Sequence, residues 1–364
     1  MSVAFTAVNY MENGQFGPTM WYHPHLRDIV VYLLGERMGY GLFTMRGMSL
    51  CTGIMTIPLV GLVLHRLTGS SRAAAIASLL LALEQVHITF SRQAIQETWT
   101  TFFFLAGVFM TLVYRDRDRP WELLAAGTAF GLGMACKFHA FFPLFVCLCF
   151  CLHGAWRQRS LPRACFVVSA LVLVPLTVYL LTYLPWFGRG YGLGDWVSMQ
   201  KALFAYTASH QGNPMDQTID RAAWQWFLRP LGYANFVFAG GRPYLTVAFS
   251  NPITWLAVIP ATAYQALAVI RARKDAEKKT GRALLLALFL ASYAPLALTA
   301  RPIWLLSALA VIPFAFMLVA LTLAELAARP GWGKRLVAVY LVVATTGSLY
   351  LYPLAVGRGM FFPY

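Results

Sequence analysis

The sequence lacks the short motifs that mark several large enzyme classes. No GxxxxGK[ST] phosphate loop, HExxH metal motif, GxSxG nucleophile turn or GxGxxG dinucleotide fingerprint occurs in its 364 residues. These absences exclude an ATP-driven machine of the phosphate-loop type, an HExxH metalloprotease, an α/β hydrolase and a Rossmann dehydrogenase.

Charged residues are scarce, and acidic residues are the scarcest. Only 12% of the residues are charged, with 14 Asp and Glu against 29 Lys and Arg, whereas 59% are hydrophobic. Because soluble domains average about 25% charged residues, water is not the solvent for most of this surface. The net charge of +15 does not indicate nucleic acid, since the basic residues lie in short runs between apolar segments. We expect an integral membrane protein with membrane lipids, and no nucleic acid, as its surroundings.

Ten apolar segments approach the roughly 20 residues that cross a bilayer. They cover residues 48–65, 71–90, 98–114, 121–136, 138–154, 163–184, 246–270, 282–299, 303–327 and 335–354. The segment 26–38 is too short and too charged to cross, and is predicted to be an interfacial helix. No internal repeat or soluble domain is visible, so the sequence predicts an all-α polytopic protein with residues 1–364 in a single membrane domain.

Arg and Lys accumulate in alternate loops, which we therefore place on the cytoplasmic side. The opposite, external side then holds residues 1–47 and a large loop over residues 185–245. No span precedes residues 1–47 to carry them across the membrane. We expect a further helix to precede Met1 in the natural protein.

The external loop 185–245 is rich in Trp, Tyr, His, Asn and Gln. Aromatic rings stack on the apolar faces of sugars, and amides bond sugar hydroxyls, so this mixture suits a carbohydrate or peptide acceptor. The alternative is an aromatic belt at the membrane surface, which uses the same residue types.

Isolated cations stand at the external ends of four predicted spans: Arg46, Arg92, Lys137 and Arg301. A lipid phosphate entering from the outer leaflet needs cations at this depth, and Arg can hold phosphate oxygens with its planar fork. Each of them alone fits better a side chain that reaches from the membrane to the headgroups, and the four together on one side make the phosphate interpretation comparably strong.

His23 and His25, in the segment WYHPHLRD, could suggest a metal pair. Residues two apart in an extended segment point in opposite directions, so we expect these histidines to contact substrate instead. We expect no metal site in the chain.

Carboxylates that could accept a proton from an attacking hydroxyl are few. Glu84 lies near the external end of an apolar segment, and an intramembrane carboxylate is a candidate functional group. Its alternative role is to pair with His87 or Arg92. Glu97 begins the next segment, where the helix dipole favours a negative charge in any case. Both are weak candidates for catalysis.

Ordered motifs over most of the chain resemble those of the protein O-mannosyltransferase family, glycosyltransferase family 39. YHPHL at residues 22–26 resembles the family's His-Pro-Pro-Leu, and HITFSRQAIQE at 87–97 resembles its Ser-Arg segment with a later acidic residue. GLGMACKFHAFF at 131–142 resembles its Gly-Leu-Ala segment with a Lys-Trp pair. WQWFLRP and SNPITW, within residues 224–255, resemble its Trp-x-Trp and Asn-Pro-x-x-Trp motifs.

This resemblance implies an eleven-span enzyme with the C-type integral-membrane glycosyltransferase fold. It would move a sugar, a hexose such as mannose, with inversion from a polyprenyl-phosphate carrier to an acceptor hydroxyl on the outer face of the membrane. By match to the Ser-Arg motif, Arg92 is the first candidate to contact the carrier phosphate, followed by Arg301 and Lys137. The family's catalytic Asp-Glu pair has no match here, and we expect it to precede Met1.

The lipid-linked sugar is the expected donor substrate, and no other cofactor is expected. The acceptor could be a protein or a lipid, the latter as in the related aminoarabinose transferases. A transporter or flippase is a further alternative, but it predicts symmetric halves that the sequence does not display. Since a soluble lumenal domain is absent, the resemblance favours a prokaryotic cytoplasmic membrane with an outward-facing active site.

Overall fold

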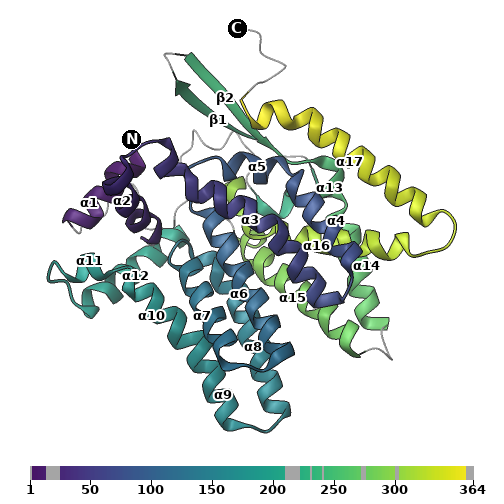
Figure 1. Ribbon diagram of the computed structural model, residues 1–364, viewed down its shortest axis with the longest axis horizontal. Helices are drawn as coiled ribbons and strands as arrows, with labels where there is room; N and C mark the ends of the chain where they lie inside the picture. The colour runs from purple at the N-terminus through teal and green to yellow at the C-terminus, as the bar shows by residue number, and fades with distance from the viewer. Residues whose placement is uncertain are drawn as a thin grey trace. The chain divides into compact units, whose positions relative to one another are not determined.

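The helices and strands of the computed structural model are shown in Figure 1. The chain divides into two compact units. Unit 1 comprises Met1–Thr52 and Gln93–Asp216, and unit 2 comprises Gly53–Arg92 and Gln217–Tyr364. The helix α3 (Leu42–Thr68) contributes residues to both. The structure describes residues 2–13, 25–209, 222–229, 232–239, 242–271, 276–299 and 303–357.

Most of the predicted spans are membrane-length helices. Within the described residues, seven helical segments are long and apolar enough to cross a membrane, or eight if one bent pair is a single span. The seven are Leu42–Thr68, Glu97–Arg117, Phe138–Arg157, Leu161–Leu181, Pro252–Arg271, Lys279–Ala297 and Gly333–Ala355. The predicted spans 121–136 and 303–327 contain shorter helices. The chain is thus a helical, multi-pass membrane protein.

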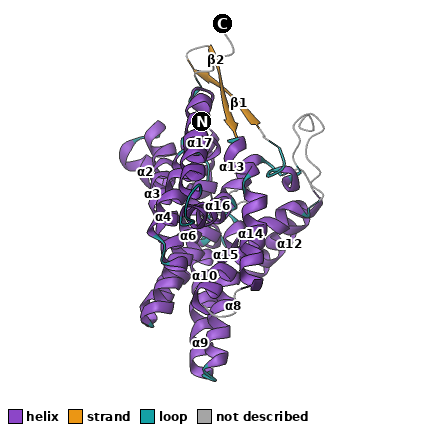
Figure 2. Cartoon of the chain, turned by 90° about the vertical axis from the view of Figure 1, so that its right-hand side faces the viewer, coloured by secondary structure: helices purple, strands orange, loops and turns teal. Residues whose placement is uncertain are grey.

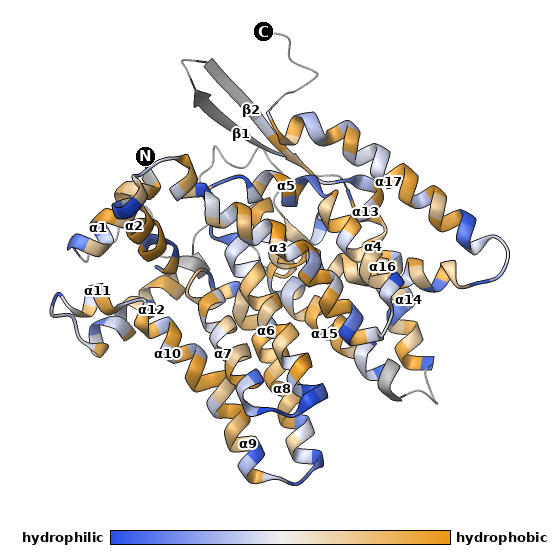
Figure 3. Ribbon diagram, in the orientation of Figure 1, coloured by the Kyte–Doolittle hydropathy of each residue, from blue (hydrophilic) through white to orange (hydrophobic). Residues whose placement is uncertain are grey.

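Unit 1 is built from helices alone in its described residues. They are α1 (Ser2–Asn13), α2 (Leu26–Met38), the first part of α3, α6 (Glu97–Arg117), α7 (Pro120–Met134), η1 (Phe138–Ala140), α8 (Phe141–Arg157), α9 (Leu161–Val168), η2 (Ser169–Leu173), α10 (Val174–Leu181), α11 (Leu184–Phe187) and α12 (Leu193–Ser209). α1 packs on α2, and α7 packs on α6, η2 and α10. Figure 3 shows that α8 and α10 are mainly apolar along their length.

Two glycines let α7 approach its neighbours closely. Gly127 and Gly131 are four residues apart on one face, a spacing typical of close helix pairs in membranes. A Cβ on Gly127 would lie 1.9 Å from the carbonyl oxygen of Ala170, and one on Gly131 would lie 2.9 Å from the Cα of Pro175. The absence of a side chain at both positions therefore lets α7 pack against η2 and α10.

Unit 2 surrounds one helix, α16 (Ile312–Ala327), which is enclosed over most of its length. Its other elements are the rest of α3, α4 (Ser71–Ala82), α5 (Gln85–Ser91), η4 (Ala223–Gln225), β1 (Gly232–Ala239), β2 (Arg242–Phe249), α13 (Pro252–Leu256), α14 (Val258–Arg271), α15 (Ala276–Ala297), η5 (Leu305–Ala310) and α17 (Gly333–Ala355). Every residue over 312–321 is buried, because α4, α14, α15 and α17 all pack on this helix. A helix that is apolar on all sides must avoid water, and α16 does so inside the protein.

The predicted span 71–90 is broken, not continuous. α4 and α5 meet at an angle of 61°, with Leu83 and Glu84 between them. Glu84 is the N-cap of α5, and its carboxylate accepts a hydrogen bond from the backbone N–H of Val86 at 3.3 Å. A capping carboxylate satisfies one of the free N–H groups that begin a helix, so Glu84 starts a new helix here.

A β-hairpin interrupts the helical pattern in unit 2 (Figure 2). β1 pairs antiparallel with β2, with Gly232 opposite Phe249 and Ala239 opposite Arg242. The predicted span at 246–270 is therefore wrong at its start, because the chain is a strand as far as Phe249 and helical only from Pro252. Asn251 caps the new helix by accepting a hydrogen bond from the backbone N–H of Ile253 at 3.1 Å.

Candidate functional site

Arg92, the first candidate for the carrier phosphate, lies at the C-terminal end of α5 with its side chain exposed. One guanidinium N–H donates to the carbonyl oxygen of Ala355 at 3.3 Å, which is its one hydrogen bond within the described residues. A guanidinium has five N–H donors. Most of the donors of Arg92 are therefore available to a ligand.

Hydrogen bonds from buried side chains hold α5 in place. Gln85 donates to the carbonyl oxygen of Ser348 at 2.8 Å, and the ring Nε2 of His87 lies 3.1 Å from the carbonyl oxygen of Gly53. Asn251 donates to the hydroxyl of the same Ser348 at 2.8 Å, so one turn of α17 is bonded both to α5 and to the residue that precedes α13. These bonds fix the backbone on which Arg92 stands.

Glu84, the first weak catalytic candidate, is only 1% exposed. Its Oε1 accepts from the N–H of Val86, whereas Oε2 is buried and has no hydrogen-bond partner among the described residues. His87 and Arg92, its two expected partners, bond carbonyl oxygens instead. The geometry therefore gives Glu84 a capping position inside unit 2.

Glu97 and Lys137 lie together in unit 1. The Nζ of Lys137 is 2.7 Å from Oε1 of Glu97, and the side chains are 14% and 10% exposed, respectively. Glu97 is the first residue of α6, while Lys137 stands between α7 and η1. The sequence named both residues as candidates but did not predict that each would neutralise the other.

His25 belongs to a buried polar cluster at the start of α2. Its Nδ1 is 3.1 Å from Oδ2 of Asp28, and Arg27 donates to Oδ1 of the same carboxylate at 3.1 Å. Tyr10 of α1 stacks on the imidazole with ring centroids 4.0 Å apart, and Tyr183 approaches it edge-on at 5.5 Å. All of these residues are buried.

The charges of the cluster follow from its contacts. Burial lowers the pKa of His25 and outweighs the opposing hydrogen bond to Asp28, so the ring is neutral at pH 7. Burial opposes ionisation of Asp28, but the hydrogen bond from His25 and the charge of Arg27 together lower its pKa. The cluster is thus a neutral imidazole beside an Arg–carboxylate pair.

Sequence reasoning missed Asp28, although the signal was present. Asp28 follows His25 by three residues, which places both on one face of a helix, and it falls in the first turn, where the helix dipole favours an acidic residue. Tyr10 and Tyr183 could not be found in this way because they are far from His25 along the chain.

Arg46 is exposed on α3 in unit 1. His23 and Arg301 lie outside the described residues. The candidates that can be placed are therefore Arg46, Lys137, Glu97 and His25 in unit 1, and Arg92 and Glu84 in unit 2.

A family model decides the identity of the chain. The model, described as dolichyl-phosphate-mannose-protein mannosyltransferase, matches residues 6–188, which is half of the chain. The chain belongs to the protein O-mannosyltransferase family. The match includes the YHPHL, Ser-Arg and Lys137 motifs that carried the resemblance.

Curated members of the protein O-mannosyltransferase family match nearly the whole chain. A polyprenol-phosphate-mannose–protein mannosyltransferase of Mycobacterium tuberculosis is 25% identical, over 92% of this chain and 77% of its own length. The protein of the same description from Mycolicibacterium smegmatis is 23% identical, over 92% and 78%.

Solved structures show that the chain has the C-type integral-membrane glycosyltransferase fold. The Saccharomyces cerevisiae protein O-mannosyltransferase Pmt1–Pmt2 complex, bound to the sugar donor, matches with a TM-score of 0.84 and 12% identity, over 98% of this chain and 86% of that chain. ArnT from Cupriavidus metallidurans, bound to undecaprenyl phosphate, matches with a TM-score of 0.62 and 16% identity, over 97% and 60%.

Proposed function

We propose that this protein transfers a hexose, mannose, from a polyprenyl-phosphate carrier to a hydroxyl group of a protein acceptor. The observation that carries this proposal is the family match over residues 6–188. The mycobacterial relatives, which match over most of their length, support mannose as the sugar, a polyprenol phosphate as the carrier and protein as the acceptor.

In the proposed reaction the acceptor oxygen bonds to the anomeric carbon of the sugar as the bond from that carbon to the phosphate oxygen breaks. The hydroxyl proton passes to a base, and the carrier leaves as polyprenyl phosphate. Negative charge therefore develops on the phosphate, where a positioned cation lowers the barrier. Arg92, exposed and with most of its N–H donors available, is proposed to supply that cation.

The other candidates are proposed to support binding. Lys137 is held by Glu97, so we assign this pair to stabilising unit 1 and not to proton transfer. We assign Glu84 to capping α5, because its carboxylate accepts a hydrogen bond from the first turn of that helix. Arg46, Arg301, His23 and His25 remain proposed substrate contacts, and no residue of the chain is assigned as the base.

The site is proposed to face outward from a prokaryotic cytoplasmic membrane, with the aromatic loop 185–245 holding the acceptor. The distribution of Arg and Lys between alternate loops supports this orientation. Aromatic residues that suit sugar and peptide surfaces support the role of the loop.

Transfer of labelled mannose tests the proposal directly. Membranes containing the full chain are supplied with labelled polyprenyl-phosphate mannose and a Ser- and Thr-containing peptide, and label is counted in peptide and lipid fractions. Arg92→Ala should lower kcat/KM by about a hundredfold or more, as expected when one donor to a developing anion is lost. Arg37→Ala, which removes an exposed arginine from the last turn of α2, outside the proposed acceptor loop, is the matched control.

The label's destination separates the alternatives. Label in the peptide supports the proposed function, whereas label in a lipid fraction alone would assign a lipid acceptor, and movement of the donor across the bilayer without transfer would indicate a flippase. Equal loss in the Arg92→Ala and Arg37→Ala variants would contradict the specific role of Arg92.

A further inference from the structure

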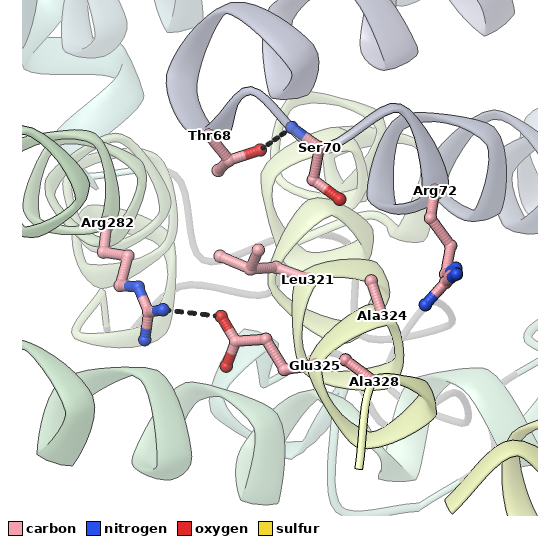
Figure 4. A pocket seen from close by; sticks show the side chains of 8 residues that line it. All are labelled: Thr68, Ser70, Arg72, Arg282, Leu321, Ala324, Glu325 and Ala328. Atoms are coloured by element: carbon pink, nitrogen blue, oxygen red, sulfur yellow. Dashed lines mark hydrogen bonds and ion pairs between the residues drawn. The ribbon is translucent and has the colours of Figure 1, made fainter. Parts of the chain in front are cut away.

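A cavity of about 470 Å³ with both charged and apolar residues in its lining lies within unit 2 (Figure 4). Three elements line it: the turn between α3 and α4, α15 near its start, and the last turns of α16. Arg72 and Arg282 belong to loops and helix ends that are rich in Arg and Lys. The cavity therefore opens on the side that the charge distribution predicts to face the cytoplasm.

The backbone of the turn is fixed by its own hydrogen bonds. Gly69 has a φ of +69°, which lets α3 end and α4 begin within a few residues. The backbone N–H of Ser70 donates to the hydroxyl of Thr68 at 3.3 Å, and the Ser70 hydroxyl accepts from the N–H of Ala73 at 3.1 Å. This wall of the cavity thus presents hydroxyl groups and the N-terminal end of α4.

Close helix packing sets the position of Arg282. A Cβ on the preceding residue, Gly281, would lie 1.9 Å from the carbonyl oxygen of Leu67, so α15 meets the end of α3 with no side chain between them. Arg282 then extends to Glu325 of α16, with 2.8 Å between guanidinium and carboxylate. Gln265 donates to the other carboxylate oxygen at 3.4 Å, which orients Glu325.

The cavity has an excess of positive charge. Two guanidinium groups and one carboxylate line it, and Figure 4 shows Arg72 and Arg282 on opposite sides with Glu325 between their helices. Arg72 is exposed and makes no hydrogen bond or ion pair with any described residue. Its whole fork is available to an anion.

We infer that this cavity binds the phosphate group of an anionic phospholipid from the cytoplasmic leaflet. Basic pockets between helix ends on this side of a membrane suit phospholipid headgroups, and the leaflet itself is negatively charged. Arg72 and Arg282 would hold phosphate oxygens through charge-assisted hydrogen bonds, with hydroxyls of the turn beside them. Glu325 keeps Arg282 in place but repels the phosphate, so it limits the affinity.

Lipid titration of the purified full chain tests the inference without using transfer activity. The chain, in a neutral detergent, is titrated with phosphatidylglycerol or phosphatidylcholine, and the thermal unfolding midpoint gives an apparent Kd. Phosphatidylglycerol should stabilise the wild type more than phosphatidylcholine does. Arg72→Gln should weaken phosphatidylglycerol binding about tenfold, the loss expected for a hydrogen-bonded charge.

A matched control and a variant of opposite sign make the result specific. Arg335→Gln removes one exposed arginine from the start of α17, on the same predicted side, and should leave the Kd unchanged. Glu325→Gln should tighten binding, because it removes the one negative charge of the cavity and leaves Gln265 an oxygen to bond. A purely structural salt bridge predicts no tightening.

Three results with the variants and the two lipids would overturn the inference. They are equal weakening by Arg72→Gln and Arg335→Gln, weaker binding by Glu325→Gln, and equal stabilisation by the two lipids. Inorganic phosphate is tested at the same concentration. If it stabilises the protein as much as phosphatidylglycerol does, the cavity binds free phosphate and the assignment of a lipid ligand is wrong.

Discussion

Removing the charge of Lys137 should destabilise unit 1 through the carboxylate left behind. The two side chains of the pair are 14% and 10% exposed and 2.7 Å apart, so neither charge is well hydrated. Breaking a buried pair by removing one partner costs about 3–5 kcal/mol, and the residual exposure here places Lys137→Met at the lower end, about 3 kcal/mol. The apparent thermal unfolding midpoint in detergent should fall accordingly.

Removing both charges should restore most of that stability. The double variant Lys137→Met with Glu97→Gln leaves no uncompensated charge, so its free energy of unfolding should return to within about 1 kcal/mol of the wild type. If Lys137 also contacts the donor, the double variant will be stable but will have a raised KM for polyprenyl-phosphate mannose. A single variant Lys137→Met as stable as the wild type would refute the assignment of a coupled, poorly hydrated pair.

Three further changes test the packing and the polar cluster. Gly127→Ala should cost about 1–3 kcal/mol, measured by thermal unfolding, because its new Cβ meets the carbonyl oxygen of Ala170 and forces a backbone shift; unchanged stability would contradict the close approach. The free energy of unfolding should fall as the pH drops below about 6.5, the ordinary pKa of histidine, because burial makes His25 bind a proton less readily in the folded state than in the unfolded chain. Below about pH 3.8 the lowered pKa of Asp28 acts in the same direction. Thermal unfolding of His25→Gln should show a flatter profile between about pH 7 and pH 5, and an unaltered slope would exclude His25 as its source. Asn251→Ala should cost about 1–3 kcal/mol in the same assay, because buried hydrogen-bonding groups of α17 lose their partner. Asn251→Asp keeps the cap on the next helix but turns a buried carboxylate toward the carbonyl oxygen of Ala344, so it should lose at least as much.

The sequence predicted the elements that depend on local pattern. The interfacial segment 26–38 is a helix with the same bounds, Leu26–Met38, and each of the ten apolar segments contains helix. The span break at Glu84 was missed because apolar composition dominates the segment, although one buried carboxylate marked the place. The hairpin was missed as well, although two apolar runs flank the Gly240-Gly241 pair that commonly marks a hairpin turn.

The sequence predicted single candidate residues of the site but not the partners that they contact. Arg92 and Lys137 were found because cations are unusual at those positions. The partner of Lys137 is 40 residues earlier in the chain, and the ring that stacks on His25 belongs to a different helix. Such contacts depend on tertiary packing, which no local spacing encodes. The assignment of all 364 residues to one membrane domain stays a prediction.

The contrast between α16 and α17 has a consequence for how this fold tolerates change. α16 is enclosed on all sides over residues 312–321, whereas only 17% of the most apolar window of α17 is buried. A lipid-facing position requires only that its residue be apolar, whereas an enclosed position also requires a side chain of the right size. Substitution of one apolar residue by another should therefore be tolerated along α17 and should disrupt packing along α16. A membrane protein with many lipid-facing positions can change most of its amino-acid residues and keep its fold. This tolerance is consistent with a TM-score of 0.84 at 12% identity.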